Sequence, residues 1–110
     1  MDLDRRAQWL RGVLDLCVLG ILCGGESYGY QLSQALKQAG FGAVQGGTLY
    51  PILLRLERSG LVTADWRQGG SGPARKYYRI SEAGRQTVGV IAKDWHDFAG
   101  SVGAIMREVS

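Results

Sequence analysis

Residues 47–80 read GTLYPILLRLERSGLVTADWRQGGSGPARKYYRI, and this stretch decides the fold of the chain. As far as Gly60, leucine and isoleucine recur at helical spacing and predict a helix with one apolar face. In residues 61–67 and 75–80 apolar and polar residues alternate instead, which predicts the two strands of a hairpin. The segment between the strands is rich in glycine and too long for a tight turn, so we expect it to project as a loop.

Two more helices are expected on the N-terminal side of this stretch. Apolar residues in 10–22 recur three and four positions apart, which predicts an amphipathic helix that ends at Gly24 and Gly25. Ser27 is a suitable N-cap for a second helix, which we expect to stop at Gly40. Three helices, a strand, a glycine-rich loop and a strand follow the order of a winged helix-turn-helix, an α+β fold that is mostly α.

A long helix is expected to end the chain, with Ser81 as its N-cap. Its apolar residues lie alternately three and four positions apart over three heptads, which is the pattern of a coiled-coil seam. We favour burial of this seam against a second copy of the chain, and packing against its own domain is the alternative. One compact domain is expected, with residues 1–80 as the winged helix-turn-helix and residues 81–110 as a dimerisation helix. The seam consists of Val88, Ile91, Trp95, Phe98, Val102, Ile105 and Val109.

Positive charge is concentrated in residues 55–85. This stretch holds seven basic and three acidic residues, a net charge of +4, whereas the rest of the chain carries −1. The excess coincides with the third helix and the loop of the hairpin, which indicates a surface that faces a polyanion such as DNA. A solvated charged face is the alternative, but the agreement between charge and fold favours DNA binding.

Four motifs resemble those of the PadR family of transcriptional regulators, and the resemblance spans roughly residues 10–98. It implies a homodimeric winged-helix repressor that dimerises mainly through its C-terminal helix and is often released from DNA by a small aromatic or cationic ligand. The short last helix resembles the compact branch of that family. Gln45 and Gly46 depart from the serine and proline common before the GTLYP motif, which weakens the expected helix cap. The motifs are SYGY at 27–30, GTLYP at 47–51, RLERSGLV at 55–62 and RKYYRISEAG at 75–84.

Candidate DNA-binding residues follow from the helix pattern and the resemblance together. The tyrosines at the start of the second helix are expected near phosphates, with core packing as their alternative. The polar face of the third helix is expected in the major groove, and the cations that flank the loop are expected on the backbone. Of Tyr77 and Tyr78, one should be buried and the other exposed beside the loop. The candidates are Tyr28, Tyr30, Thr48, Tyr50, Arg55, Arg58, Arg67, Arg75 and Lys76.

Trp95 is a candidate ligand-binding residue. It falls in the middle of the seam, where a large flat indole fits poorly into a tightly interlocked coiled coil. In a dimer, two copies near the symmetry axis could stack on a planar aromatic or cationic effector. Simple filling of the dimer core is the alternative. A dimer of this kind is expected to bind a pseudo-palindromic duplex.

Other classes of protein are disfavoured. His96 is the only histidine and no cysteine or carboxylate lies at a metal-ligand spacing from it, so we expect no metal, no cofactor and no enzymatic activity. Cys17 and Cys23, six positions apart in one predicted helix, cannot form a disulfide with each other. No signal peptide or membrane span is recognisable, and we expect a soluble, cytoplasmic protein. A winged-helix module that binds protein or a small ligand without reading DNA is the alternative function.

Overall fold

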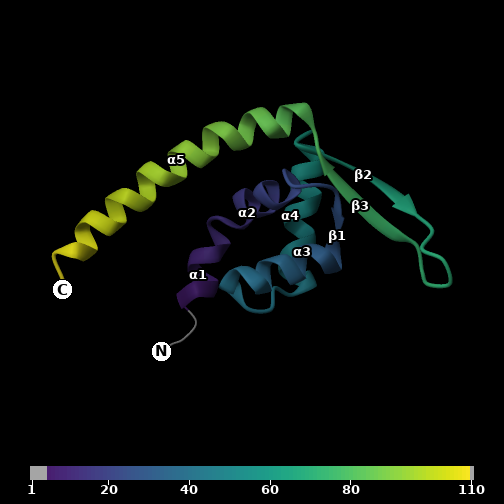
Figure 1. The fold of residues 1–110 in the computed structure, drawn as a ribbon, viewed down its shortest axis with the longest axis horizontal. Helices are drawn as coiled ribbons and strands as arrows, with labels where there is room; N and C mark the ends of the chain where they lie inside the picture. The colour runs from purple at the N-terminus through teal and green to yellow at the C-terminus, as the bar shows by residue number, and fades with distance from the viewer. Residues whose placement is uncertain (1–4, 110) are drawn as a thin grey trace.

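The computed structural model describes residues 5–109, and its hairpin and last helix leave the helical core in different directions. Helices α1 to α4 gather in the middle of the molecule, the β2–β3 hairpin projects on one side, and α5 extends on the other (Figure 1). This order confirms the predicted mostly helical α+β fold. The elements are α1 (Arg5–Arg11), α2 (Leu14–Leu22), β1 (Ser27–Tyr28), α3 (Gly29–Leu36), a π-helical turn η1 (Lys37–Phe41), α4 (Gly46–Arg58), β2 (Val62–Arg67), β3 (Arg75–Ile80) and α5 (Glu82–Arg107).

The single helix predicted over residues 10–22 is divided in the structure. α1 and α2 lie on either side of Gly12 and Val13, and Val13 has φ −129° and ψ 7°, outside the helical region. Gly12 is a poor helix former, and both residues donate their N–H groups to carbonyls three positions earlier, which closes α1. Leu10 before the break and Leu14 after it both point into the core, where they are 6% and 1% exposed.

Ser27 does not cap a helix, and here the prediction is wrong. The residue lies in β1 opposite Tyr78 of β3, and its buried hydroxyl donates to Oε1 of Gln31 at 3.2 Å. The N-cap position of α3 is instead Tyr28, whose side chain makes no capping hydrogen bond. A two-residue strand is too short to show alternation, and pairing with β3 is what satisfies its backbone groups, so no local pattern reveals it.

The three strands form one antiparallel sheet in the order β1-β3-β2. In the predicted hairpin, Val62 lies opposite Ile80 and Arg67 lies opposite Arg75, so both predicted strands are confirmed. This register gives the sheet an inner face towards α4 and an outer face that carries all three arginines of the hairpin. The outer-face residues of the hairpin are Thr63, Asp65, Arg67, Arg75, Tyr77 and Arg79.

The core lies between α2, α3, α4 and the inner face of the sheet. Leu49, Leu53 and Leu56 of α4 are at most 4% exposed, as predicted, while Ile52 is only partly buried. Gly40, with φ 103°, lies inside η1 and interrupts its helical backbone at the position where the second helix was predicted to stop, whereas α3 itself ends at Leu36. Both cysteines are free thiols. The most deeply buried side chains are Leu14, Val18, Leu19, Leu22, Leu32, Leu36, Leu49, Leu53 and Val62.

The start of α5 is fixed against the start of the hairpin. As predicted, Ser81 is its N-cap: Oγ accepts from the Gly84 N–H at 3.0 Å and donates to the Gly60 carbonyl at 2.7 Å. Gly84 is buried, and a Cβ at this position would collide with the carbonyl oxygen of Leu61. A glycine is therefore required where α5 crosses the chain that leads into β2.

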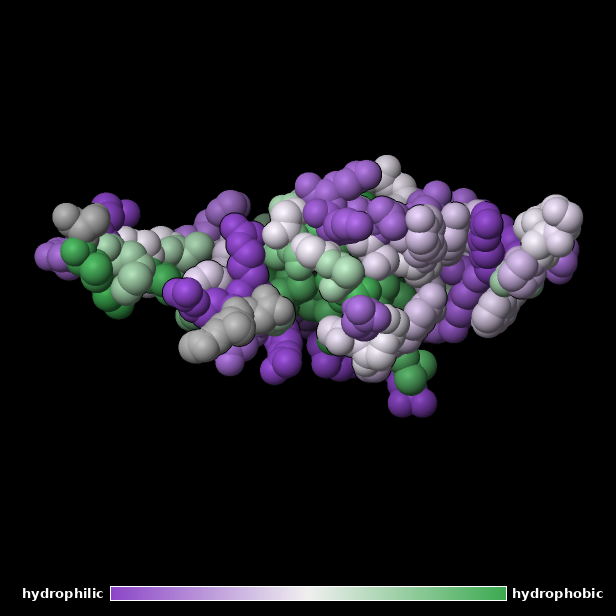
Figure 2. All heavy atoms as spheres, turned by 90° about the horizontal axis from the view of Figure 1, so that it is seen from below, coloured by the Kyte–Doolittle hydropathy of each residue, from purple (hydrophilic) through white to green (hydrophobic). Residues whose placement is uncertain are grey.

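Further along, α5 leaves the core and its apolar seam becomes exposed. Val88 and Ile91 are partly buried, whereas Phe98 and Ile105 are each 64% exposed. Figure 2 shows apolar residues along the projecting end of this helix. Although α5 has 26 residues, neither it nor any other helix within residues 5–109 is long and apolar enough to span a membrane.

Candidate nucleic-acid interface

The outer face of α4 is the first part of the candidate interface. Three leucines of this helix point into the core, so the polar residues between them point outward. The only carboxylate of the helix, Glu57, is partly buried at the edge of that face. The exposed residues of α4 are Gly46, Gly47, Thr48, Tyr50, Pro51, Leu54, Arg55 and Arg58, which include all four DNA-binding candidates of this helix.

An apolar groove separates α4 from the hairpin. Its volume is about 600 Å³, and Tyr50 and Leu54 of α4 face Trp66 of β2 across it. Tyr78 forms the floor and is only 4% exposed, whereas Trp66 is 68% exposed. Four of the predicted DNA-binding residues line this groove with Tyr50, so the fold brings the predicted tyrosines and two cations of the hairpin together. These four are Tyr28, Tyr30, Arg75 and Lys76.

The ring of Tyr50 is held against two glycines. A Cβ on Gly46 would lie 3.3 Å from the ring, and a Cβ on Gly29 would overlap its hydroxyl. Gly29 is the first residue of α3 and is buried. The absence of a side chain at this position is what allows Tyr50 to lie across the start of α3, at one end of the groove.

A cation–aromatic stack covers the outer face of the sheet. The Arg67 guanidinium lies 4.4 Å from the centre of the Tyr77 ring, and the Arg75 guanidinium lies 4.7 Å from the centre of the Tyr28 ring. The two rings meet edge to face with their centroids 5.3 Å apart. The four side chains therefore form a continuous stack that joins β1, β2 and β3.

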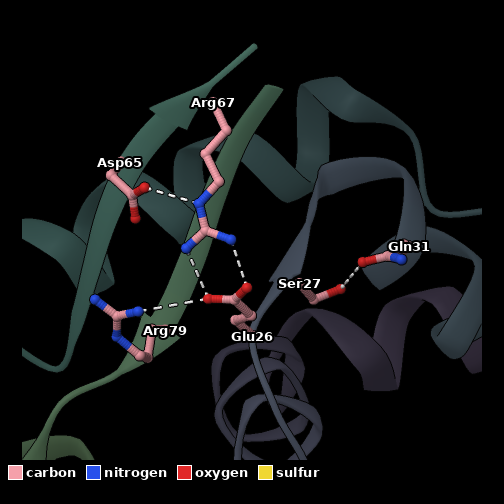
Figure 3. Close-up of polar contacts among 6 residues, drawn as sticks. All are labelled: Glu26, Ser27, Gln31, Asp65, Arg67 and Arg79. Carbon is pink, nitrogen blue, oxygen red and sulfur yellow. Dashed lines mark hydrogen bonds and ion pairs between the residues drawn. The ribbon is translucent and has the colours of Figure 1, made fainter. Parts of the chain in front are cut away.

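Glu26 ties the same face together electrostatically (Figure 3). Its carboxylate accepts two hydrogen bonds from Arg67, the longer at 2.8 Å, and one from Arg79 at 3.4 Å. Arg67 also donates to Asp65 at 2.9 Å. The hydrogen bonds from Arg67 lower the pKa of Glu26, and those to Glu26 and then Asp65 raise the pKa of Arg67. The charge of Arg67 is thus paired with two carboxylates of the protein itself, Glu26 and Asp65.

Lys76 is engaged in a similar way. Its ammonium donates to Glu57 of α4 at 3.1 Å, which raises the pKa of Lys76 and joins the hairpin to the helix. Beside it, burial raises the pKa of Tyr78. Lys76 lines the groove, but a phosphate would have to compete with Glu57 for its charge.

The remaining predicted cations are more available. Arg55 makes one contact of 3.3 Å with Asp15, and the two side chains are 61% and 42% exposed. Exposed ion pairs of this kind contribute little, so Arg55 can exchange Asp15 for a phosphate at small cost. Arg58 and Arg75 have no carboxylate partner within residues 5–109.

Three residues of this surface were not predicted from the sequence to belong to it. Leu54 and Trp66 belong to patterns that predict a helix and a strand, and neither pattern shows that they face each other across a groove. Glu26 lies in a connection, where a single acid gives no sign of its partners. The expectation for the tyrosine pair is confirmed in that Tyr78 is buried, although Tyr77 is half-buried under Arg67 instead of exposed.

Trp95 lies at the point where α5 loses contact with its own domain. Its side chain is 37% exposed, and its ring centroid is 6.2 Å from that of Phe98, one turn further along. The two rings form an aromatic surface on the seam side of the helix.

Comparisons with known proteins agree on one family. A sequence model described as "Transcriptional regulator PadR-like family" matches residues 18–90. The transcriptional regulator Rv3488 of Mycobacterium tuberculosis is 38% identical over 78 residues, which is 71% of this chain and 71% of that protein.

Two solved structures are similar over most of the chain. A PadR-like transcriptional regulator from Bacillus cereus superposes with a TM-score of 0.79 and 35% identity, and the match covers 90% of this chain and 96% of that one. Bacillus subtilis PadR, solved in complex with operator DNA, matches with a TM-score of 0.64 and 28% identity over 76% of this chain and 46% of that one.

Proposed function

The chain belongs to the PadR-like family of transcriptional regulators, and on this premise we propose that it binds duplex DNA as a homodimer and represses transcription. The DNA-binding surface consists of the outer face of α4, the start of α3 and the end of the hairpin next to its loop. Its proposed residues are Tyr28, Tyr30, Thr48, Tyr50, Arg55, Arg58, Arg75 and Lys76, with Arg67 holding the hairpin in place through Glu26.

The observation that carries DNA binding is the charge distribution on α4. The helix exposes two arginines, while its single carboxylate, Glu57, is neutralised by Lys76. A B-DNA major groove admits one α-helix, and positive side chains beside that helix are drawn to the flanking phosphates. Arg75, at the base of the hairpin loop, lines the protein groove on the side opposite α4 and offers the DNA backbone a second point of attachment. That the similar Bacillus subtilis PadR was solved in complex with operator DNA supports duplex DNA as the partner.

Dimerisation is supported by the seam of α5. Trp95, Phe98 and Ile105 lie on one side of a helix that projects from its domain, and they are 37%, 64% and 64% exposed. An exposed apolar stripe of heptad spacing is a surface for a second helix. A dimer would present two copies of α4 to two half-sites about 34 Å apart on one face of the duplex.

Trp95 is the proposed site for an effector. Two Trp95–Phe98 surfaces at a dimer axis would offer flat aromatic faces to a planar aromatic or cationic molecule. Such a molecule would touch both protomers, so it would alter the separation of the two α4 helices if it favoured one separation over another. DNA affinity would then depend on the effector.

The test of DNA binding is the salt dependence of the affinity, measured by fluorescence anisotropy with a labelled duplex. Arg75→Ala should lower the affinity on all sequences and reduce the slope of log K against log salt by about one unit. Lys93→Ala is the matched control, because Lys93 is an exposed cation of α5 away from the groove and outside the heptad seam. An unchanged slope in Arg75→Ala would exclude the hairpin from the interface, and salt-independent binding would exclude the whole proposal.

A further inference from the structure

The groove between α4 and the hairpin exposes large apolar side chains at the centre of a surface proposed to bind a polyanion. Tyr50 is 52% exposed, Leu54 44% and Trp66 68%, and all three line the same groove. Single exposed apolar residues are ordinary, but a cluster of three on one concave surface marks a binding site. The seam of α5 does not account for this cluster, because it lies on a different element.

Leu54 restricts what this part of α4 can recognise. Its side chain has no donor or acceptor, so it cannot read a base edge through hydrogen bonds. Of the groups that base pairs present in the major groove, only the C5-methyl of thymine is apolar. An aliphatic side chain that a recognition helix presents to the DNA major groove therefore distinguishes thymine from the other bases.

The surroundings of Leu54 suit this role. Tyr50 lies four positions earlier on the same side of α4, and its ring is fixed against Gly29 and Gly46. One wall of the groove is therefore rigid and apolar over one helical turn. Arg75 lines the same groove from the hairpin and has no carboxylate partner within residues 5–109, so a strand whose phosphate meets this guanidinium would bring its base edges towards Leu54.

We propose that Leu54, supported by Tyr50, reads a thymine methyl group in each half-site of the operator. This inference rests on the proposed DNA binding and adds the chemistry by which part of the sequence is read. The occupant of the groove is the edge of one DNA strand, with its methyl group between Leu54 and Tyr50 and its sugar–phosphate backbone against Trp66 and Arg75.

The experiment begins with selection of binding sites from a random duplex pool by the full-length protein. Each thymine of the selected site is then replaced in turn by deoxyuridine, which removes only the methyl group. At one position in each half-site the replacement should weaken binding about fourfold, the effect of one apolar carbon group withdrawn from contact, and about fifteenfold when both half-sites are changed. Leu54→Ala should reduce the thymine-to-uracil affinity ratio at that position to about one.

Val90→Ala is the matched control, since Val90 is an exposed aliphatic residue of α5 outside the seam, and it should leave the ratio at about fourfold. A selected site at which no uracil replacement matters would overturn the inference and leave DNA binding intact. A methyl effect that persists in Leu54→Ala would equally overturn it, because the methyl would then be read elsewhere. Failure to select any sequence would instead count against the proposed sequence-specific function.

Discussion

Replacement of Gly84 by alanine tests the contact that fixes α5, the proposed dimerisation helix, to the rest of the chain. In the middle of an exposed helix the change from glycine to alanine stabilises a protein by about 1 kcal/mol. At Gly84 the added Cβ would collide with the Leu61 carbonyl and would lie 2.7 Å from Cγ1 of Ile80. Both neighbours belong to packed structure, and one is main chain, so neither can move at little cost.

The size of the effect follows from these two contributions. Overpacking of a core by one carbon costs about 1–3 kcal/mol, and a collision with main chain lies at the upper end of that range. The gain in helix propensity offsets about 1 kcal/mol of it. Gly84→Ala should therefore lower the free energy of unfolding by about 2 kcal/mol, which for a domain of this size lowers Tm by about 10 °C.

Two glycines of the same helix provide internal controls. A Cβ on Gly89 or Gly100 would meet nothing within 4 Å, and both positions lie outside the heptad seam. Gly89→Ala and Gly100→Ala should each raise Tm by about 4–5 °C. The assay is thermal unfolding by circular dichroism at one fixed protomer concentration, because the Tm of a dimer depends on concentration. If Gly84→Ala raised Tm as much as the other two, the crossing of α5 over Leu61 would be refuted.

Three further predictions concern the seam, the groove and the outer face of the sheet. Phe98→Asp should convert the dimer into a monomer in sedimentation velocity at micromolar concentration, because a carboxylate is costly in a dry interface, and a variant that stays dimeric would contradict the seam. Gly29→Ala should displace the Tyr50 ring and weaken DNA binding about fivefold, with little change in Tm; unchanged affinity would remove Tyr50 from the interface. The pKa of Glu26 is lowered in the folded state, so the stability it contributes is present above its ordinary value of 4.5 and is lost as pH falls through the folded value. In Arg67→Ala, NMR titration should show the pKa of Glu26 shifted up towards that ordinary value, and an unshifted pKa would show that Arg67 does not cause the depression.

Elements defined by a sustained local pattern were predictable from the sequence. α4 is marked by buried leucines at helical spacing, and α5 by its heptad and by the capping serine, so both have nearly the expected bounds. The hairpin is marked by alternation on both sides of a glycine-rich loop, and both of its strands have nearly the expected bounds. In each case one segment carries its own evidence, because its spacing already determines which face is buried.

The features that were missed depend on contacts between distant segments. β1 consists of Ser27 and Tyr28 and exists only because β3 pairs with it, so Ser27 resembled a helix cap. The contact between Arg67 and Glu26 was not predicted, because the two residues lie 41 positions apart in the sequence. The apolar groove was not predicted either. Leu54 and Trp66 belong to different elements, and no local sequence pattern encodes how these elements are placed relative to each other.

The central claim is that two copies of this chain, joined through α5, place two α4 helices on one operator. The most direct measurement is selection of binding sites from a random duplex pool, followed by native mass spectrometry of the selected complex. We expect a pseudo-palindromic site whose half-sites lie about 10 base pairs apart, bound by two protomers per duplex. A selected site without two-fold symmetry, a complex with one protomer per duplex, or no enrichment of any sequence would contradict the account.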